Sequence, residues 1–244
     1  MRMATSKIPG IIYEDSDILV INKPQGLIVH HGAGVTSGTL YDMLTDVYHD
    51  ADIGFKEECR MGIVHRLDKD TSGLMVVAKN TLSYTSLVDA FKNHKVHKEY
   101  NALCYGFFNK TEDVIDTFIA RSKADRKKFS VSKNLEGKNA ITHYEVLDQF
   151  EFGKKKKQYA ALLKILIETG RTHQIRVHMS SIAHPVINDP IYSKKRVDEI
   201  SSLGLMLMSS LLAFEHPVTK KQMEFAIPVA SRFTECIGIL HGIQ

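Results

Sequence analysis

The stretch HRLDKDTSGL at residues 65–74 says most about the fold and chemistry of the chain. This stretch places a carboxylate, Asp68, two residues after an arginine in a short polar segment. The apolar runs at residues 61–64 and 74–78 predict buried strands on both sides of it. A single Asp in a loop is usually a turn former, but functional residues concentrate on loops that rigid elements hold in place. Asp68 is therefore the first candidate for chemistry.

The length of the chain, 244 residues, suits one large domain or two small ones. Hydrophobic residues make up 43% and charged residues 25%, which is typical of a globular protein with a sizeable core. Because no linker or repeat interrupts the sequence, we expect a short tail at residues 1–10 and a single domain over residues 11–244. No apolar run approaches the roughly 20 residues of a membrane span, and the first ten residues lack the apolar core of a secretory signal. The cytoplasm is the expected compartment.

The sequence gives no sign of a metal or cofactor site. The three cysteines are far apart and odd in number, and the close pairs of histidines lack further ligands at metal spacing. Gly32 and Gly34 begin a dinucleotide-binding pattern, but Ser37 stands where its third glycine should be. A GxxxxGK[ST] phosphate loop does not occur either. We therefore expect chemistry without a cofactor or metal.

The net charge of +4 is weak support for a nucleic-acid partner. The distribution of the charge is more informative, because basic residues gather in clusters. Solvated loops would explain such clusters equally well, and residues 154–157 fit a hairpin tip. If the clusters surround one cleft, they form a track for RNA phosphates. The largest cluster is Arg121, Lys123, Arg126, Lys127, Lys128 and Lys133.

Strand patterns outnumber helix patterns, which favours an α+β fold with a mixed, mostly antiparallel sheet flanked by helices. Helices are expected at residues 39–48, 80–92 and 171–182, with a short one after residue 228. Strands are expected at residues 17–22, 27–30, 74–78, 98–105, 140–147 and 158–167, and extended segments at 203–214 and 222–227.

The HRLDxxTSGL motif resembles the active-site motif of the RluA family of RNA pseudouridine synthases. Further segments match this family in the same order, and the resemblance runs from about residue 11 to about residue 228. Asn188 and the segment LMS at 207–209 depart from the usual family pattern. The matching segments are the NKPQG turn at 22–26, KEY at 98–100, TGRTHQIRVH at 169–178, and the two HP pairs at 184–185 and 216–217.

The resemblance implies a pseudouridine-synthase-like fold with a central RNA-binding cleft, without the N-terminal RNA-binding domain of some members. It implies that Asp68 is the nucleophile and that Arg66 enters the RNA helix in place of the flipped base. Tyr100 would lie against the target base, and Arg171 would pair with the catalytic carboxylate. Ribosomal or transfer RNA is the expected partner of a likewise expected monomer that needs no protein partner. Candidate RNA contacts are His65, Arg121, Arg126, Lys127 and Lys128.

The implied reaction breaks the N1–C1′ bond of a uridine and rejoins the uracil through C5. It needs a carboxylate beside the sugar, a cation to keep that carboxylate ionised, and a flat side chain to hold the loose base. Two alternatives remain at this point. An N-glycoside hydrolase could use the same aspartate, although glycosidases need a second carboxylate. A non-catalytic RNA-binding protein would tolerate the loss of Asp68.

Overall fold

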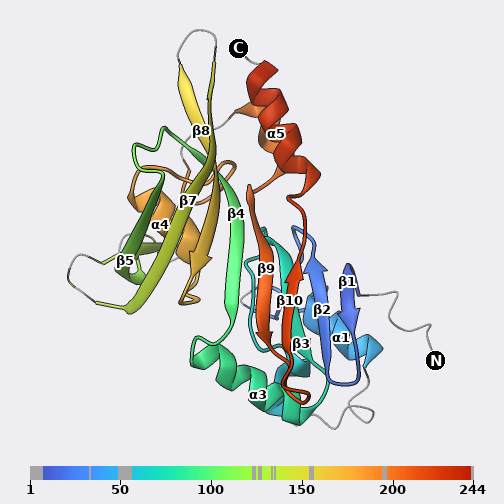
Figure 1. Ribbon diagram of the computed structural model, residues 1–244. Helices are drawn as coiled ribbons and strands as arrows, with labels where there is room; N and C mark the ends of the chain where they lie inside the picture. Colours follow the sequence, from blue (N-terminus) through green and yellow to red (C-terminus); the bar gives the residue numbers. More distant parts are fainter. Residues whose placement is uncertain are drawn as a thin grey trace. The chain divides into compact units, whose positions relative to one another are not determined.

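The computed structural model describes residues 8–32, 34–48, 57–122, 125, 128–132, 134, 136–153, 157–193 and 197–242. The chain forms two compact units, whose elements can be followed in Figure 1. Unit 1 comprises residues 1–97 and 211–227, and unit 2 comprises residues 98–210 and 228–244. The single domain expected over residues 11–244 stays a prediction.

Unit 1 is built on a sheet that carries the HRLDKDTSGL segment. Strand β2 (Ile18–Lys23) pairs antiparallel with β1 (Ile11–Glu14) on one side and with β3 (Ser72–Ala78) on the other. Strand β10 (Gln222–Ala226) pairs antiparallel with the second half of β9 (Leu207–Glu215). Every residue of β3 is buried, so the strand that follows Asp68 is a rigid support.

Polar side chains cap the helices of unit 1 at their N-terminal ends. Helix α1 (Leu40–Val47) follows Thr39, whose hydroxyl accepts the Asp42 N–H while Asp42 accepts the Thr39 N–H in return. Helix α3 (Thr81–Lys92) follows Asn80, which accepts the Ser83 N–H at 2.8 Å. Leu87 of α3 is buried in a core cluster with apolar residues of β2, β3 and β9. The short helix η2 (Glu57–Gly62) precedes the HRLD segment.

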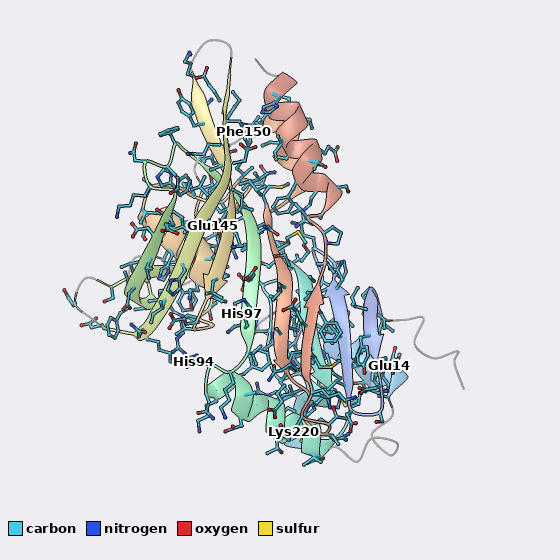
Figure 2. All side chains as sticks on the ribbon, in the orientation of Figure 1. Glu14, His94, His97, Glu145, Phe150 and Lys220 are labelled. Carbon is cyan, nitrogen blue, oxygen red and sulfur yellow. The ribbon has the colours of Figure 1, made fainter. Side chains whose placement is uncertain are left out.

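Unit 2 contains a second set of antiparallel strands. Their order is β4 (His97–Tyr105), β8 (Gln158–Ile167), β7 (Lys138–Phe152), β5 (Glu112–Arg121) and β6 (Phe129–Val131). Helix α4 (Gln174–Ser181) packs Val177 against Ile119 and Ala140. Helix α5 (Ser231–Gly242) packs against the short helix η3 (Asp198–Leu203), and the ring of its His241 lies 5.0 Å from the Phe150 ring of β7 (labelled in Figure 2).

The predicted α+β class with a mostly antiparallel sheet is confirmed, but some elements differ. The return strand predicted at residues 27–30 is wrong, because this segment instead accepts the N–H groups of Leu40 and Tyr41 at the start of α1. The strand predicted at 61–64 is also wrong, because Met61 has a left-handed backbone with φ 52°. The helix predicted from residue 171 begins at Gln174. Strands β5 and β6 were not predicted.

All three cysteines are buried and form no disulfide. Cys59 lies in unit 1, whereas Cys104 and Cys236 lie in unit 2. No helix in the described part of the chain has both the length and the apolar character that a membrane span needs.

A buried ion pair gives a test of unit 2. Arg176 binds Asp189 through two bonds of 2.7 and 2.9 Å, and both side chains are almost fully buried. We expect Arg176→Met to lower the free energy of unfolding by about 3–5 kcal/mol, because it leaves a buried carboxylate without its cation. The exposed pair Lys110–Asp113 is the control, and Lys110→Met should cost less than about 1 kcal/mol. Equal losses in urea titrations would contradict this account.

Candidate active site

The HRLD segment of unit 1 is fixed along its length by alternating contacts. The Nε2 atom of His65 accepts the Val76 N–H at 3.0 Å, and the His65 ring stacks on Phe91 at 4.4 Å. Leu67 is buried, whereas Arg66 is exposed and Asp68 is half-buried. This alternation anchors the loop on its apolar side and leaves the arginine toward solvent. His65 is thus a support of the loop, and its predicted contact with RNA stays a prediction.

The most unusual residue near Asp68 is Lys23, which is fully buried at the end of β2. Its Nζ atom donates to the carbonyl oxygens of Pro24 at 3.0 Å, Leu27 at 2.9 Å and Lys69 at 3.1 Å. The Gly26 N–H donates to the same Lys69 oxygen at 2.9 Å. The NKPQG turn therefore binds the backbone of the residue that follows Asp68.

The charge of Lys23 is disfavoured by its surroundings. Burial lowers the pKa of Lys23 to about 8, although the charges of Asp70 and then Asp68 act to raise it. A cation inside the fold is thus within electrostatic reach of the candidate nucleophile. Sequence reasoning placed Lys23 in a turn motif and missed this role, for which a lysine between a buried strand and a proline was the only signal.

Tyr100 and Arg171 belong to unit 2. Tyr100 is 7% exposed on β4, and through Ile165 it lies in register with Tyr144 of β7. Residues paired across antiparallel strands share a face, so Tyr100 lies on the face of β7 that carries Thr142, which contacts α4. Arg171, half-buried in the turn before α4, donates its Nε–H to the Asn139 carbonyl at 2.9 Å.

A buried polar network holds this turn in place. Gln174 accepts the Thr169 hydroxyl at 2.7 Å and the Arg171 N–H at 3.0 Å. Its amide donates to Thr142, which contacts His178 Nδ1 at 2.9 Å. The Thr117 hydroxyl lies 3.0 Å from Nε2 of the same ring, so a neutral imidazole has a hydroxyl partner at both nitrogens. Burial lowers the pKa of His178 to about 4, in agreement with this arrangement.

A second set of contacts joins β6 to α4. His173 begins α4 with a left-handed backbone, φ 57°, and its Nδ1 lies 2.9 Å from the Tyr192 hydroxyl. The same hydroxyl accepts the Phe129 N–H at 3.0 Å. Arg121 lies over the Phe129 ring at 5.5 Å, and the ammonium of Lys128 is 3.8 Å from an Asp125 oxygen. Arg126 and Lys127, the other predicted RNA contacts, lie outside the described residues.

The predicted site residues therefore fall into two groups. His65, Arg66 and Asp68 share one loop of unit 1, whereas Tyr100 and Arg171 both belong to unit 2. The predicted pairing of Asp68 with Arg171 joins residues of different units and stays a prediction.

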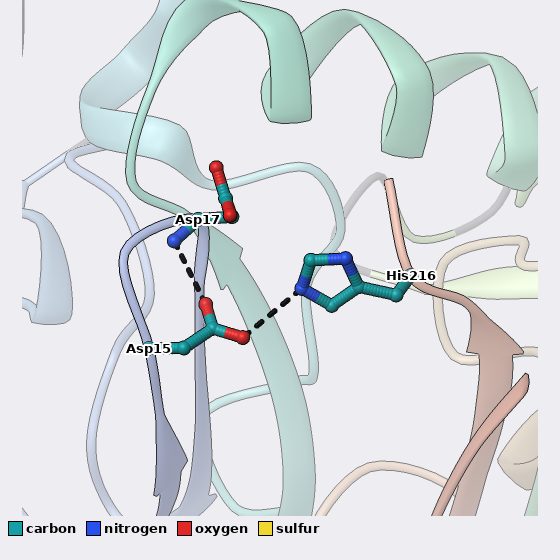
Figure 3. Close-up of side chains that lie close together, drawn as sticks. All are labelled: Asp15, Asp17 and His216. Atoms are coloured by element: carbon teal, nitrogen blue, oxygen red, sulfur yellow. Dashed lines mark hydrogen bonds and ion pairs between the residues drawn. The ribbon is translucent and has the colours of Figure 1, made fainter. Parts of the chain in front are cut away.

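Asp15, Asp17 and His216 come close enough together in unit 1 to suggest a metal site (Figure 3). The contacts of His216 contradict that use. Its Nδ1 atom accepts the N–H groups of Val218 at 3.2 Å and Thr219 at 3.0 Å. Nε2 must therefore carry the ring proton, which it donates to Asp15 at 3.0 Å. Neither ring nitrogen offers a lone pair to a metal.

The carboxylate of Asp15 is equally occupied. One oxygen accepts the N–H groups of Asp17 at 2.7 Å and Ile18 at 2.8 Å. The other accepts the Tyr13 hydroxyl at 2.8 Å as well as His216. Burial acts to raise the pKa of Asp15, but these hydrogen bonds outweigh it and lower the pKa. The group therefore secures the turn between β1 and β2 to the segment after β9.

Unit 2 also contains a cavity of about 450 Å³. Glu99, which lines it, precedes Tyr100 along β4, so it points to the opposite face of the strand. Lys164 pairs with Glu145 (labelled in Figure 2) at 2.7 Å, yet carboxylates outnumber cations around the cavity. An acidic cavity repels phosphates and does not suit the RNA backbone. Its charged lining residues are Glu99, Glu112, Asp113, His143, Glu145 and Lys164.

Comparison with known proteins assigns the chain. The family model described as RNA pseudouridylate synthase matches residues 17–181. An RNA pseudouridine synthase of Aquifex aeolicus is 47% identical over 233 residues, which cover 92% of this chain and 70% of the relative. The chain belongs to the RNA pseudouridylate synthase family. A second relative is the ribosomal large subunit pseudouridine synthase D of Buchnera aphidicola. It is 43% identical to this chain over an alignment that covers 95% of this chain and 72% of the relative.

A solved structure agrees with this assignment. Human RNA pseudouridylate synthase domain containing 1 superimposes with a TM-score of 0.71 and 25% identity, over 96% of each chain. Members of the pseudouridine synthase family are isomerases that form pseudouridine in RNA, so the resemblance to the RluA family is confirmed. The alternatives of a hydrolase and of a non-catalytic RNA-binding protein are not favoured.

Lys23 gives a first test of the loop. We expect Lys23→Met to lower the free energy of unfolding by about 1–3 kcal/mol, because the carbonyls of Pro24 and Leu27 lose a charge-assisted donor. The same substitution at the exposed Lys69 of the neighbouring loop is the control and should change stability by less than about 0.5 kcal/mol. Unfolding in guanidinium chloride measures both, and a Lys23→Met protein as stable as the Lys69→Met protein would refute the anchoring role.

His178 gives a test in acid. The folded protein holds His178 neutral down to a pKa of about 4, whereas the unfolded chain protonates it near 6.5. Between these values the unfolded state binds the extra proton, so stability falls as the pH drops, by up to about 3 kcal/mol.

In His178→Gln this part of the pH dependence should disappear, although the variant is less stable overall. The matched control is His94→Asn, an exposed site whose left-handed backbone, φ 56°, suits asparagine. The measurement is the slope of the unfolding free energy against pH. If wild type and His178→Gln have the same slope from pH 6.5 to 4, the neutral state of His178 is wrong.

Proposed function

We propose that this enzyme converts uridines of ribosomal RNA to pseudouridine and that Asp68 is its catalytic residue. The observation that carries the proposal is the HRLDKDTSGL loop, in which a half-buried Asp68 follows an exposed Arg66 on a backbone bound by Lys23. The relative from Buchnera aphidicola, whose name refers to the ribosomal large subunit, favours ribosomal over transfer RNA.

The reaction fits a site that supplies a carboxylate and fixed polar groups. The N1–C1′ bond breaks, the uracil turns, and a C5–C1′ bond forms while C5 loses a proton and N1 gains one. Nothing is oxidised or reduced, so the balance needs no cofactor. Asp68 would attack the sugar or the uracil, or would assist the departure of the base as an ionised group.

The other residues are assigned by their settings. The exposed side chain of Arg66 suits entry into the RNA stack, where it replaces a base whose extrusion costs on the order of a few kcal/mol. Tyr100 offers a flat ring on a rigid strand, which suits a surface against which uracil lies. Arg171 is held at Nε by the Asn139 carbonyl, which would aim its remaining nitrogens at a carboxylate. His65, Arg121 and Lys128 are proposed RNA contacts.

Three further expectations stay predictions. They are that the enzyme works in the cytoplasm, that it acts as a monomer and that it needs no protein partner.

The proposal is tested first by mapping pseudouridines in total RNA from a strain that lacks this gene and from its parent. We expect one or a few pseudouridines of ribosomal RNA to be missing in the deletion strain and to return with the wild-type gene. Losses confined to transfer RNA would contradict the proposed substrate, and an unchanged map together with an inactive purified protein would contradict the activity.

Asp68→Asn isolates the chemical step. We expect the purified variant to lose at least about a thousandfold in turnover on RNA from the deletion strain, because an amide is a poor nucleophile. Its RNA affinity and its melting temperature should stay close to those of the wild type. Asp70→Asn makes the same change two residues away and should keep most of the activity. Turnover by Asp68→Asn at the wild-type rate would remove Asp68 from the mechanism.

A further inference from the structure

The segment before the HRLD loop has a strained backbone. Arg60, Met61 and Gly62 have consecutive left-handed conformations, with φ of 47°, 52° and 78°. For residues other than glycine this conformation costs roughly 1–2 kcal/mol each. Packing of the neighbouring side chains holds this strained conformation in place, since Cys59 is 3%, Met61 6% and Ile63 4% exposed. The result is that Arg60 alone among these residues points to solvent.

The strained turn is tied to the same strand as the catalytic loop. The Ile63 N–H donates to the Arg60 carbonyl at 3.2 Å, which closes the turn. Ile63 then forms a bridge with Val77 of β3, and His65 binds the neighbouring N–H of Val76. Arg60 and Asp68 are therefore held by one rigid strand, within one unit.

Further basic residues lie near this turn. His30 and His31 both contact the ring of Tyr41 in α1, with centroids 5.5 and 5.3 Å apart, and α1 packs against η2. Burial lowers the pKa of His30, and the charges of Arg60, Arg66 and His31 lower it further. The charges of Arg60 and Arg66 thus both act at the position of His30. We call Arg60, Arg66, His30 and His31 the Arg60 patch.

One acid, Asp42, contacts the patch through its His31 member. One oxygen of Asp42 binds His31 at 2.6 Å. The other accepts the N–H and the hydroxyl of Thr39 at 2.8 and 2.9 Å. Asp42 is therefore occupied by its own helix cap and by His31, and Arg60 and Arg66 supply the other positive charges of the patch.

We propose that Arg60 binds a backbone phosphate of the substrate RNA beside the target uridine, and that the Arg60 patch is a phosphate-binding surface. A guanidinium matches phosphate oxygens with two parallel donors. The strain at residue 60 is explained if the turn exists to present this cation, because glycine or asparagine would fit the backbone better. The proposal deepens the proposed function and rests on it.

The test uses the salt dependence of RNA binding. A phosphate contact to single-stranded RNA contributes about 0.7 to the slope of log K against log salt. We expect Arg60→Gly and Arg60→Gln to lower the slope by about this amount and to weaken the binding of a short labelled oligouridylate several-fold. Lys92→Gln removes the same charge from an exposed position at the end of α3 and should leave the slope unchanged.

Two further measurements separate contact from structure. Arg60→Gly should be as stable as the wild type or more stable, because glycine accepts a φ of 47° without strain. In the wild type, oligouridylate should raise the pKa of His30 in an NMR titration, because a bound phosphate cancels the positive field. This rise should shrink in Arg60→Gly. A merely structural role of Arg60 would move neither the salt slope nor the titration.

The proposal is overturned if both Arg60 variants keep the wild-type slope, or if Lys92→Gln lowers it equally. An oligouridylate with neutral methylphosphonate linkages adds a check. Because it offers no phosphate charge, the wild type and Arg60→Gly should bind it equally well. These results are distinguishable from a failure of the proposed function. If the wild type isomerises RNA but the slope does not depend on Arg60, only the patch is wrong. If the wild type binds RNA without turnover, the isomerase proposal is wrong whatever Arg60 does.

Discussion

The bonds from one buried ammonium to three backbone carbonyls define the candidate site in unit 1. Lys23 stands at the end of β2, and its Nζ atom reaches back to Pro24 and Leu27 and across to Lys69. Loops normally stay at the surface because their carbonyls need partners. Here a side chain supplies the partners where two loops meet beside Asp68, at the end of the paired strands β2 and β3. The same cation lies within electrostatic reach of Asp68 and Asp70.

In unit 2, neutral side chains supply the hydrogen-bond partners that hold a functional-site turn in place. The turn that carries Arg171 is held by Gln174, whose amide oxygen and nitrogen are both used inside the core. Thr142 then passes the hydrogen-bond chain on to His178. Such networks are stable only when each member is satisfied, which explains why so many polar residues of the TGRTHQIRVH segment are buried. A single motif thus combines Arg171, an arginine whose role in the site is proposed, with the residues that fix its backbone.

Many of the strands and helices could be predicted from the sequence where local signals were strong. The strand at 158–167 and the helices at 39–48 and 80–92 follow from the pattern of their apolar residues, and the structure confirms these elements. The strand predicted at residues 27–30 was wrong because carbonyls of this segment accept N–H groups at the start of α1, and periodicity does not reveal such non-local hydrogen bonds. Strand β5 was missed because its exposed and buried residues do not form an apolar run. The role of Lys23 needed three-dimensional contacts, and the assignments of Asp68 and Arg171 depended on whole motifs rather than on spacing.

The burial of all three cysteines gives the protein a built-in reporter of its motions. A thiol that is shielded in the folded state reacts with a labelling reagent only when the structure around it opens. Cys59 lies next to the strained turn at Arg60, whereas Cys104 is in β4 and Cys236 in α5. The order in which these sulfurs become accessible to the reagent would therefore rank the local opening of unit 1 against that of unit 2 without any introduced cysteine.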